Sequence, residues 1–410
     1  MPNKNTVKLS RATFMFPLAL VLFEFSVYIG NDLVQPAMLA ITQDFNVSSD
    51  WAPSSMSFYL LGGAAVAWLL GPLSDHLGRK KVLLAGVLFF SLCCLLILLT
   101  QNIKSFLTLR FFQGMGLSVI TAVGYAAIQE IFDERDAIKV LALMANVSLL
   151  APLLGPLLGA FLIEHISWHW GFIAISMLAL LSWFGLKAKM PNTPLPSQKM
   201  SVTEIYYDFK QVFSNKKFLG FAFSLPLVSL PLMLWIALSP IMLVESLGLS
   251  SLAYGMAQFP VLGGLMLGNV VLIKVIDHLP LGKTVQIGLP MMLFGSLLLL
   301  IGTFILPQYF LIFLLLGMTC ISFGDGIAFS VLYRFTLMSS EISKGTVAAA
   351  VSIILMLSFF FILELARILY RYFDVQAYTL LCVSLIVLWF TAPKYQLKQL
   401  MQQRKKQGKF

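Results

Sequence analysis

Two acidic residues, Glu24 and Asp32, lie inside an apolar stretch that runs from about residue 14 to residue 39. This stretch is long enough to cross a bilayer as a helix. A charged side chain at membrane depth is costly unless it faces a polar cavity or a partner, so such residues usually belong to the path of a proton, an ion or a substrate. The two carboxyl groups therefore predict that the chain moves a solute across a membrane.

The polar residues of this stretch share one side of the predicted helix. At about 100° per residue, a narrow stripe contains Glu24, Tyr28, Asn31 and Gln35, with Asp32 at its edge. The stripe runs from the middle of the membrane toward its outer side.

Arg110 is the basic residue best placed to meet these acids. It lies a few residues into a later apolar stretch that runs inward, at a depth comparable to that of Asp32. Gln113, three residues on, shares its face and can orient either group. Burial favours a neutral carboxyl and a nearby guanidinium favours a carboxylate. A movable Arg110 or an arriving cation can therefore decide whether Asp32 or Glu24 holds a proton.

The alternative for Glu24 and Asp32 is a structural polar network that holds helices together. Two acids with one evident arginine leave a negative charge uncompensated, and an uncompensated acid is what proton coupling needs. The residue types therefore favour coupling.

Composition predicts what surrounds these residues. Of 410 residues, 59% are hydrophobic and 11% are charged, which excludes a soluble globular protein. Spans this apolar must be helices, because a lone strand would leave its backbone groups unpaired in lipid and no alternating barrel pattern occurs. We predict an all-α integral membrane protein with twelve transmembrane helices, near residues 12–39, 53–73, 82–100, 106–130, 138–164, 169–188, 218–244, 252–276, 284–306, 309–337, 346–370 and 376–393.

Lysine and arginine predict the orientation. The loops on the opposite side offer little beyond Lys104 and Arg371, so the basic loops, the central linker and both termini are expected in the cytoplasm. The net charge of +10 then reflects topology and not nucleic-acid binding. The basic loops contain Arg79, Lys80, Lys81, Arg135, Lys139, Lys274, Lys283 and Lys344.

A proline-rich polar segment divides the chain into two halves of six spans. We predict an N-terminal bundle over 1–187, a cytoplasmic linker over 188–217, and a C-terminal bundle with a basic tail over 218–410. The two bundles are expected to be pseudo-symmetric around a central cavity. Inside the linker, Ser201 and Glu204 match a capping box that opens an amphipathic helix, either a tether between moving halves or a simple connector. Its apolar face comprises Val202, Ile205, Phe209 and Val212.

Residues for other chemistries are scarce. His165 and His169 lie one helical turn apart on an outer loop, which is weak evidence for a metal site, so we expect no metal. No nucleotide-binding loop or nucleophile–base arrangement occurs, so we expect neither an enzyme nor a cofactor. No disulfide is expected, because the four cysteines, Cys93, Cys94, Cys320 and Cys382, all lie in apolar spans.

The loop after the second span, residues 71–81 (GPLSDHLGRKK), resembles the signature loop of the major facilitator superfamily. In that loop Asp75 can face the positive end of a neighbouring helix. Across the Gly78 turn, Arg79 can reach Glu130 at the cytoplasmic end of the fourth span. Together these residues are expected to form a conformational latch on the inner side. The alternative is a set of solvated charges that only set topology.

The fifth span contains residues 151–160 (APLLGPLLGA), which resemble the glycine–proline motif of antiporters in that superfamily. By physics alone, Gly155 and Gly159 permit close helix contact and Pro156 bends the helix. The implied role in antiport comes from the resemblance.

Residues 24–32 (EFSVYIGND), 109–114 (LRFFQG), 122–130 (AVGYAAIQE) and 343–346 (SKGT) look like the drug/proton antiporter branch of that superfamily. The resemblance implies efflux of lipophilic cationic and neutral drugs across the bacterial cytoplasmic (inner) membrane by alternating access. Its proton-coupling residues are then Glu24, Asp32 and Arg110. The expected partners are drugs, protons and membrane lipids, with no nucleic acid, and we expect a monomer. Predicted substrate contacts are Tyr28, Asn31, Asp32, Gln113, Met144, Leu232, Trp235 and Ile236, although the apolar ones can equally face lipid.

The second half contains further intramembrane charges. Glu364 and Arg367 lie three residues apart and are expected to neutralise each other. Asp325 and Arg334 point about half a turn apart, so they cannot both face one cavity unless the helix is distorted. Asp325 is left with three alternatives: a third proton site, a determinant for cationic drugs, or a partner of a neighbouring helix.

Two other function classes stay open at this point. A proton-coupled symporter or exporter of a metabolite or peptide would use the same architecture, and proton-driven accumulation inside the cell would identify uptake. A membrane enzyme or a passive channel would need neither the latch nor the buried acids.

Overall fold

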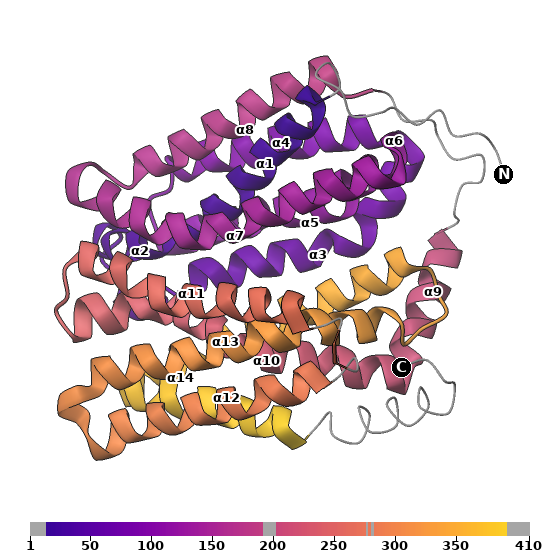
Figure 1. Cartoon of the computed structure of the whole chain (residues 1–410). Helices are drawn as coiled ribbons and strands as arrows, with labels where there is room; N and C mark the ends of the chain where they lie inside the picture. The colour runs from indigo at the N-terminus through magenta and orange to yellow at the C-terminus, as the bar shows by residue number, and fades with distance from the viewer. Residues whose placement is uncertain (1–13, 192–201, 276–277, 280–282, 392–410) are drawn as a thin grey trace. The chain divides into compact units, whose positions relative to one another are not determined.

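The computed structural model describes residues 14–191, 202–275, 278–279 and 283–391, and these residues form helices with no strand among them (Figure 1). They belong to two compact units, Met1–Ile205 and Tyr206–Phe410, each with its own core. The boundary between the units lies within the linker predicted over 188–217.

In the first unit, α1 of the first span packs against α7, the fifth span, and α8, the sixth span (Figure 1). The second span, α3, packs against α5 of the fourth span, and α4 is the third span. The elements of this unit are α1 (Met15–Asp32), α2 (Val34–Asp44), the 3₁₀ turn η1 (Ser49–Trp51), α3 (Ser54–Leu77), α4 (Arg79–Ile97), α5 (Ile103–Ser118), the π-helical η2 (Val119–Gly124), α6 (Tyr125–Ile131), α7 (Glu134–His165) and α8 (His169–Lys189).

The first predicted span is two helices, α1 and α2, that meet at Leu33. The sequence supplies the cause, because Pro36 has no backbone N–H to donate to the carbonyl of Asp32 one turn earlier. The helix is therefore interrupted directly after the second acid. Leu33 keeps a helical backbone conformation, so the two helices continue in nearly the same direction.

The fourth span is interrupted as well. Its residues form α5, then the six π-helical residues of η2, then α6. A π-helical turn inserts extra backbone and changes the register of every side chain after it. Residues beyond Gly124 therefore face directions that a regular helix would not give.

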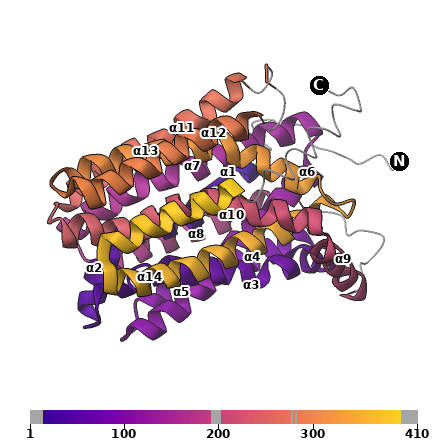
Figure 2. The same ribbon diagram turned by 90° about the horizontal axis from the view of Figure 1, so that it is seen from below.

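In the second unit, α13 packs against both α11 and α12, and α10 packs against α13 and α14 (Figure 2). Its elements are α10 (Lys216–Pro240), the π-helical η3 (Ile241–Ser246), α11 (Ser251–Val275), α12 (Lys283–Leu300), the π-helical η4 (Ile301–Ile305), the 3₁₀ turn η5 (Pro307–Tyr309), α13 (Phe310–Leu337) and α14 (Lys344–Thr391).

Ten helical segments of the described residues are long and apolar enough to cross a membrane. One of them, α14, is two helices, because Asp374 has a non-helical backbone with φ 50° and ψ −138°. The 32-residue α7 is also long enough to span. The helices therefore fit the predicted all-α membrane fold with twelve transmembrane helices.

The predicted amphipathic helix of the linker is α9 (Val202–Ser214). Val212 is buried, whereas Tyr206 and Tyr207 are exposed, so the predicted apolar positions and the outward positions separate along it. The predicted cap, Ser201, lies outside the described residues. Asn215 then begins α10, since its Oδ1 accepts hydrogen bonds from the backbone N–H groups of Lys217 and Phe218.

Candidate functional site

Arg110 on α5 is completely buried, and each nitrogen of its guanidinium donates a hydrogen bond. Its Nε donates to Ser55 Oγ at 3.0 Å, and its Nη1 donates to the Gly30 carbonyl at 3.0 Å and to Gln113 Oε1 at 2.6 Å. Its Nη2 donates to Asn31 Oδ1 at 3.4 Å. Three spans of the first unit therefore hold this one charge.

Aromatic and amide contacts complete the enclosure. The Arg110 Cζ lies 4.5 Å from the centroid of the Tyr59 ring, a cation–π distance, and the Tyr59 hydroxyl donates to the Val27 carbonyl at 2.8 Å. Gln113 Nε2 in turn contacts Cys94 Sγ at 3.0 Å. Arg110 is therefore a buried cation with a hydrogen bond on each guanidinium nitrogen, and the movement of this guanidinium during transport stays a prediction.

Asp32 is buried at the end of α1, and Asn31 connects it to Arg110. Asn31 Nδ2 donates to Asp32 Oδ1 at 3.0 Å, while its Oδ1 accepts from Arg110. Among the described residues, no ion pair within 4.0 Å joins Asp32 and Arg110. The predicted meeting of the two charges is therefore indirect. The Asn31 amide binds both the Asp32 carboxyl and the Arg110 guanidinium.

The glycine–proline segment of α7 packs directly on this acid. A Cβ atom added at Gly155 would lie 2.6 Å from the Cβ of Asp32, and one added at Gly159 would lie 2.3 Å from the Leu33 carbonyl oxygen. Only glycine permits the backbone of α7 to approach the α1–α2 junction this closely. Pro156 lies inside α7 between these contacts. The sequence predicts close packing here, but not that Asp32 is what the segment packs against.

Glu24 lies at the middle of α1 and is also completely buried. Its Oε1 accepts a hydrogen bond of 2.7 Å from the hydroxyl of Tyr125, the first residue of α6. Sequence reasoning assigned Tyr125 no role. Its position follows the π-helical η2, and helical periodicity across that segment does not predict which way the ring points.

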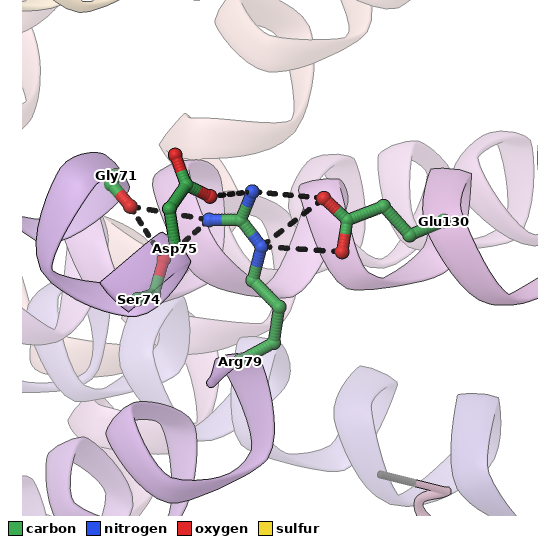
Figure 3. A network of polar contacts seen from close by, with 5 residues as sticks. All are labelled: Gly71, Ser74, Asp75, Arg79 and Glu130. Atoms are coloured by element: carbon green, nitrogen blue, oxygen red, sulfur yellow. Dashed lines mark hydrogen bonds and ion pairs between the residues drawn. The ribbon is translucent and has the colours of Figure 1, made fainter. Parts of the chain in front are cut away.

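Where α3 ends and α4 begins, Arg79 bridges two acids from neighbouring spans (Figure 3). Its Nη2 forms an ion pair with Asp75 and another of 2.8 Å with Glu130 Oε1. Its Nη1 donates to the carbonyl of Gly71 at 3.2 Å and to the hydroxyl of Ser74.

A tight turn positions this guanidinium. Gly78 has φ 95°, a left-handed conformation that favours glycine, and it separates the end of α3 from the start of α4. Asp75 and Arg79 therefore face each other across the turn, while Glu130 approaches from α6. The contacts join neighbouring ends of three spans, α3, α4 and α6, and such a junction is what the predicted latch requires.

The other predicted substrate contacts divide between the units. Tyr28 is half-buried on α1 and Met144 is buried on α7, whereas Leu232, Trp235 and Ile236 are buried on α10. The Trp235 indole N–H donates to Gln258 Oε1 on α11 at 2.7 Å. That hydrogen bond holds the indole in one orientation.

In the second unit, Asp325 is buried and Arg334 on the same helix is exposed. They point in different directions, as the helical spacing predicts. Ser229 Oγ on α10 donates to Asp325 Oδ1 at 3.4 Å. The expected pair on α14 is present, with Arg367 Nε 3.0 Å from Glu364 Oε2.

The two histidines that were weighed as a weak metal site have other hydrogen-bond partners. His165 Nδ1 lies 2.9 Å from the Phe161 carbonyl, and His169 Nδ1 lies 2.7 Å from Ser167 Oγ. In the part of the chain that the structure describes, no three histidine, cysteine or acidic residues gather as a metal site, and the four cysteines are free.

Comparison of the sequence with known proteins identifies the family of the chain. The family model described as Major Facilitator Superfamily matches residues 20–395. Chloramphenicol resistance protein CraA of Acinetobacter baumannii is 67% identical over 404 residues, which covers 98% of each chain. Multidrug transporter MdfA of Yersinia pestis is 44% identical over 383 residues, 93% of each chain, and that of Escherichia coli O6:H1 is 45% identical over 370 residues, 90% of each chain.

Solved structures share the fold at low sequence identity. A D-xylose–proton symporter superposes with a TM-score of 0.75 at 16% identity, covering 93% of this chain and 98% of the other. The POT family transporter PepTSo superposes with a TM-score of 0.73 at 11% identity, covering 96% and 99%. At these identities the likeness concerns the fold alone.

Proposed function

The chain belongs to the Major Facilitator Superfamily, and from that premise we propose that it exports lipophilic cationic and neutral drugs in exchange for protons. The observation that carries the proposal is the environment of the Asp32 carboxyl. This carboxyl is buried, bound to a neutral amide and without a direct ion pair to Arg110, so taking up or losing a proton changes the charge of the site.

The names of the relatives support the substrate class. CraA is named for resistance to chloramphenicol, a neutral drug, and MdfA is named as a multidrug transporter. Both cover more than nine-tenths of this chain, and both are named for transport or resistance. These relatives therefore support a transporter and not an enzyme.

The exchange proceeds in two half-cycles. A proton from outside neutralises Asp32 or Glu24 while the transporter faces outward. A drug arriving from the cytoplasm competes with that protonated state, and the proton leaves to the cytoplasm. Alternating access then carries the drug out. For a monovalent cation exchanged against one proton, the membrane potential cancels and the proton gradient drives export.

Each part of the first unit has a role in this scheme. Arg110 supplies a buried positive charge, and the Asn31 amide connects it to Asp32 by hydrogen bonds. Tyr125 donates to Glu24 and so links its carboxyl to the fourth span. Gly155 and Gly159 on α7 bring the fifth span into direct contact with Asp32 and Leu33, so a change at Asp32 is passed to the fifth span through packing.

The remaining predicted residues complete the scheme. Asp75, Gly78, Arg79 and Glu130 close the inner side as a latch that opens when the bundles change conformation. The drug contacts Tyr28, Asn31, Gln113, Met144, Leu232, Trp235 and Ile236. The protein works as a monomer in the lipid of the bacterial inner membrane, with both termini in the cytoplasm and the linker tethering the two bundles.

The test is drug-dependent proton release from the purified protein. We expect chloramphenicol to release protons from the wild-type protein in weakly buffered detergent, and Glu24→Gln together with Asp32→Asn to abolish that release. Glu341→Gln, an exposed acid, is the matched control and should release as the wild type does. Unchanged release in the double variant would refute the coupling role. Everted vesicles with an acid interior should take up drug, whereas a symporter would not accumulate it there.

A further inference from the structure

Asp325 is a buried carboxyl that the scheme above leaves unused. It lies near the middle of α13 and is 3% exposed. Its partner is the hydroxyl of Ser229 on α10, at 3.4 Å, a long distance for a hydroxyl donor. Among the described residues, no cation lies within ion-pair distance of it.

The helix that carries this carboxyl is held tightly on two sides. A Cβ atom added at Gly324 would lie 2.7 Å from the Gly288 carbonyl oxygen on α12, and one added at Gly326 would lie 2.4 Å from the Leu265 carbonyl oxygen on α11. The residues on either side of Asp325 therefore fix the rotation of α13, and its side chain is directed toward α10.

Charged groups on the packed elements lie elsewhere. Arg334 on α13 is exposed on a different side of the helix. The lysines of α10, α11 and α12 lie in first or last turns: these are Lys216, Lys217, Lys274 and Lys283. On α14, Lys344 is the first residue, Glu364 pairs with Arg367, and Arg371 and Asp374 lie at the kink. Ser229, which faces Asp325, carries no charge.

The two units show a related arrangement. In the first unit, an acid on the first span, Glu24, accepts from a hydroxyl on the fourth span, Tyr125, at 2.7 Å. In the second unit, an acid on the fourth span, Asp325, accepts from a hydroxyl on the first span, Ser229. Each unit therefore places one carboxyl against one hydroxyl between its first and fourth spans, with the roles exchanged.

We propose that Asp325 is a third proton-exchange site, which adds one proton to each cycle of drug export. A carboxylate without a cation in an apolar setting is costly unless it takes up a proton, and Ser229 alone does not neutralise it. The proton comes from the outer aqueous phase, forms the O–H bond of the carboxyl, and leaves to the cytoplasm when drug binds. No other bond changes. This inference rests on the proposed function.

The experiment counts protons released per chloramphenicol bound by full-length protein in weakly buffered detergent. We expect Asp325→Asn to bind drug and release about one proton fewer than the wild type. Ser229→Ala keeps the carboxyl and loses only the contact, so it should release the wild-type number. A merely structural Asp325 predicts an unchanged count in Asp325→Asn, and that outcome would overturn the proposal.

A second measurement needs no substitution. A buried protonated carboxyl reacts with dicyclohexylcarbodiimide, so mass spectrometry of the wild-type protein should find Asp325 modified and chloramphenicol should suppress that modification. An unmodified Asp325 beside a modified Glu24 also refutes the third site. If the wild type releases no protons at all on drug binding, the proposed function itself fails, which separates the two outcomes.

Discussion

Gly155 is the position where one added methyl group is expected to disturb Asp32 most directly. The new Cβ would lie 2.6 Å from the Cβ of Asp32 and 3.0 Å from the backbone N of Leu33. Carbon atoms pack best at about 3.5–4.0 Å, so α7 has to retreat from α1 by about 1 Å. Overpacking of this kind costs about 1–3 kcal/mol, whereas alanine in place of a helical glycine contributes at most about 1 kcal/mol. If alanine gains the full 1 kcal/mol, Gly155→Ala should lower the free energy of unfolding by up to roughly 2 kcal/mol.

The matched control is Gly263 on α11, where an added Cβ meets nothing within 4 Å. Gly263→Ala keeps the helical gain without the clash, so its stability should equal or exceed that of the wild type. Unfolding of each purified variant, followed by circular dichroism in the same detergent, measures the difference.

The functional arm uses the same proteins. Because the retreat of α7 separates it from Asp32, Gly155→Ala should also lose much of its chloramphenicol-dependent proton release, and Gly263→Ala should keep it. If Gly155→Ala unfolds like the control and releases protons like the wild type, the close contact between α7 and Asp32 has neither the energetic nor the functional weight assigned to it.

Two further changes test the bridge and the latch. Asn31→Ala removes the amide between Arg110 and Asp32, so we expect the protein to stay folded and drug-dependent proton release to fall sharply; full release would mean that the bridge does not transmit the charge. Arg79→Lys keeps a positive charge but cannot reach Asp75 and Glu130 together, so drug export from cells should fall at least several-fold with unchanged amounts of protein in the membrane, and wild-type resistance would refute the latch.

Contacts set by helical spacing or by depth in the membrane could be predicted from the sequence. The pairing of Glu364 with Arg367 follows from a separation of three residues on one helix. The approach of Arg79 to Glu130 followed from loop topology and from the depth of each residue in its span. In such cases, one helical period or one membrane crossing determines which groups lie near each other.

Contacts that depend on irregular backbone, on which spans pack together, or on side-chain geometry could not be predicted in this way. Tyr125 reaches Glu24 only after six π-helical residues have changed the register of the fourth span. Gly155 meets Asp32 because of how the first and fifth spans pack, and no local spacing encodes which helix a glycine faces. The amide bridge of Asn31 likewise depends on side-chain geometry that the polar stripe on α1 left open.

The indirect contact between Arg110 and Asp32 has a physical consequence for exchange. A direct ion pair at about 4 Å is worth roughly 4 kcal/mol at an effective dielectric constant of about 20, which is about three factors of ten in proton affinity. A carboxylate held that firmly would stay ionised through the cycle and could not return a proton. Under the proposed exchange, Asn31 between the two groups would let Arg110 keep the site polar without fixing the charge of Asp32. Arg110 itself donates four hydrogen bonds and lies against an aromatic ring, so moving its guanidinium would break several contacts at once. In the proposed exchange we therefore expect the change that accompanies drug binding to involve Asp32 and the helices around it more than Arg110.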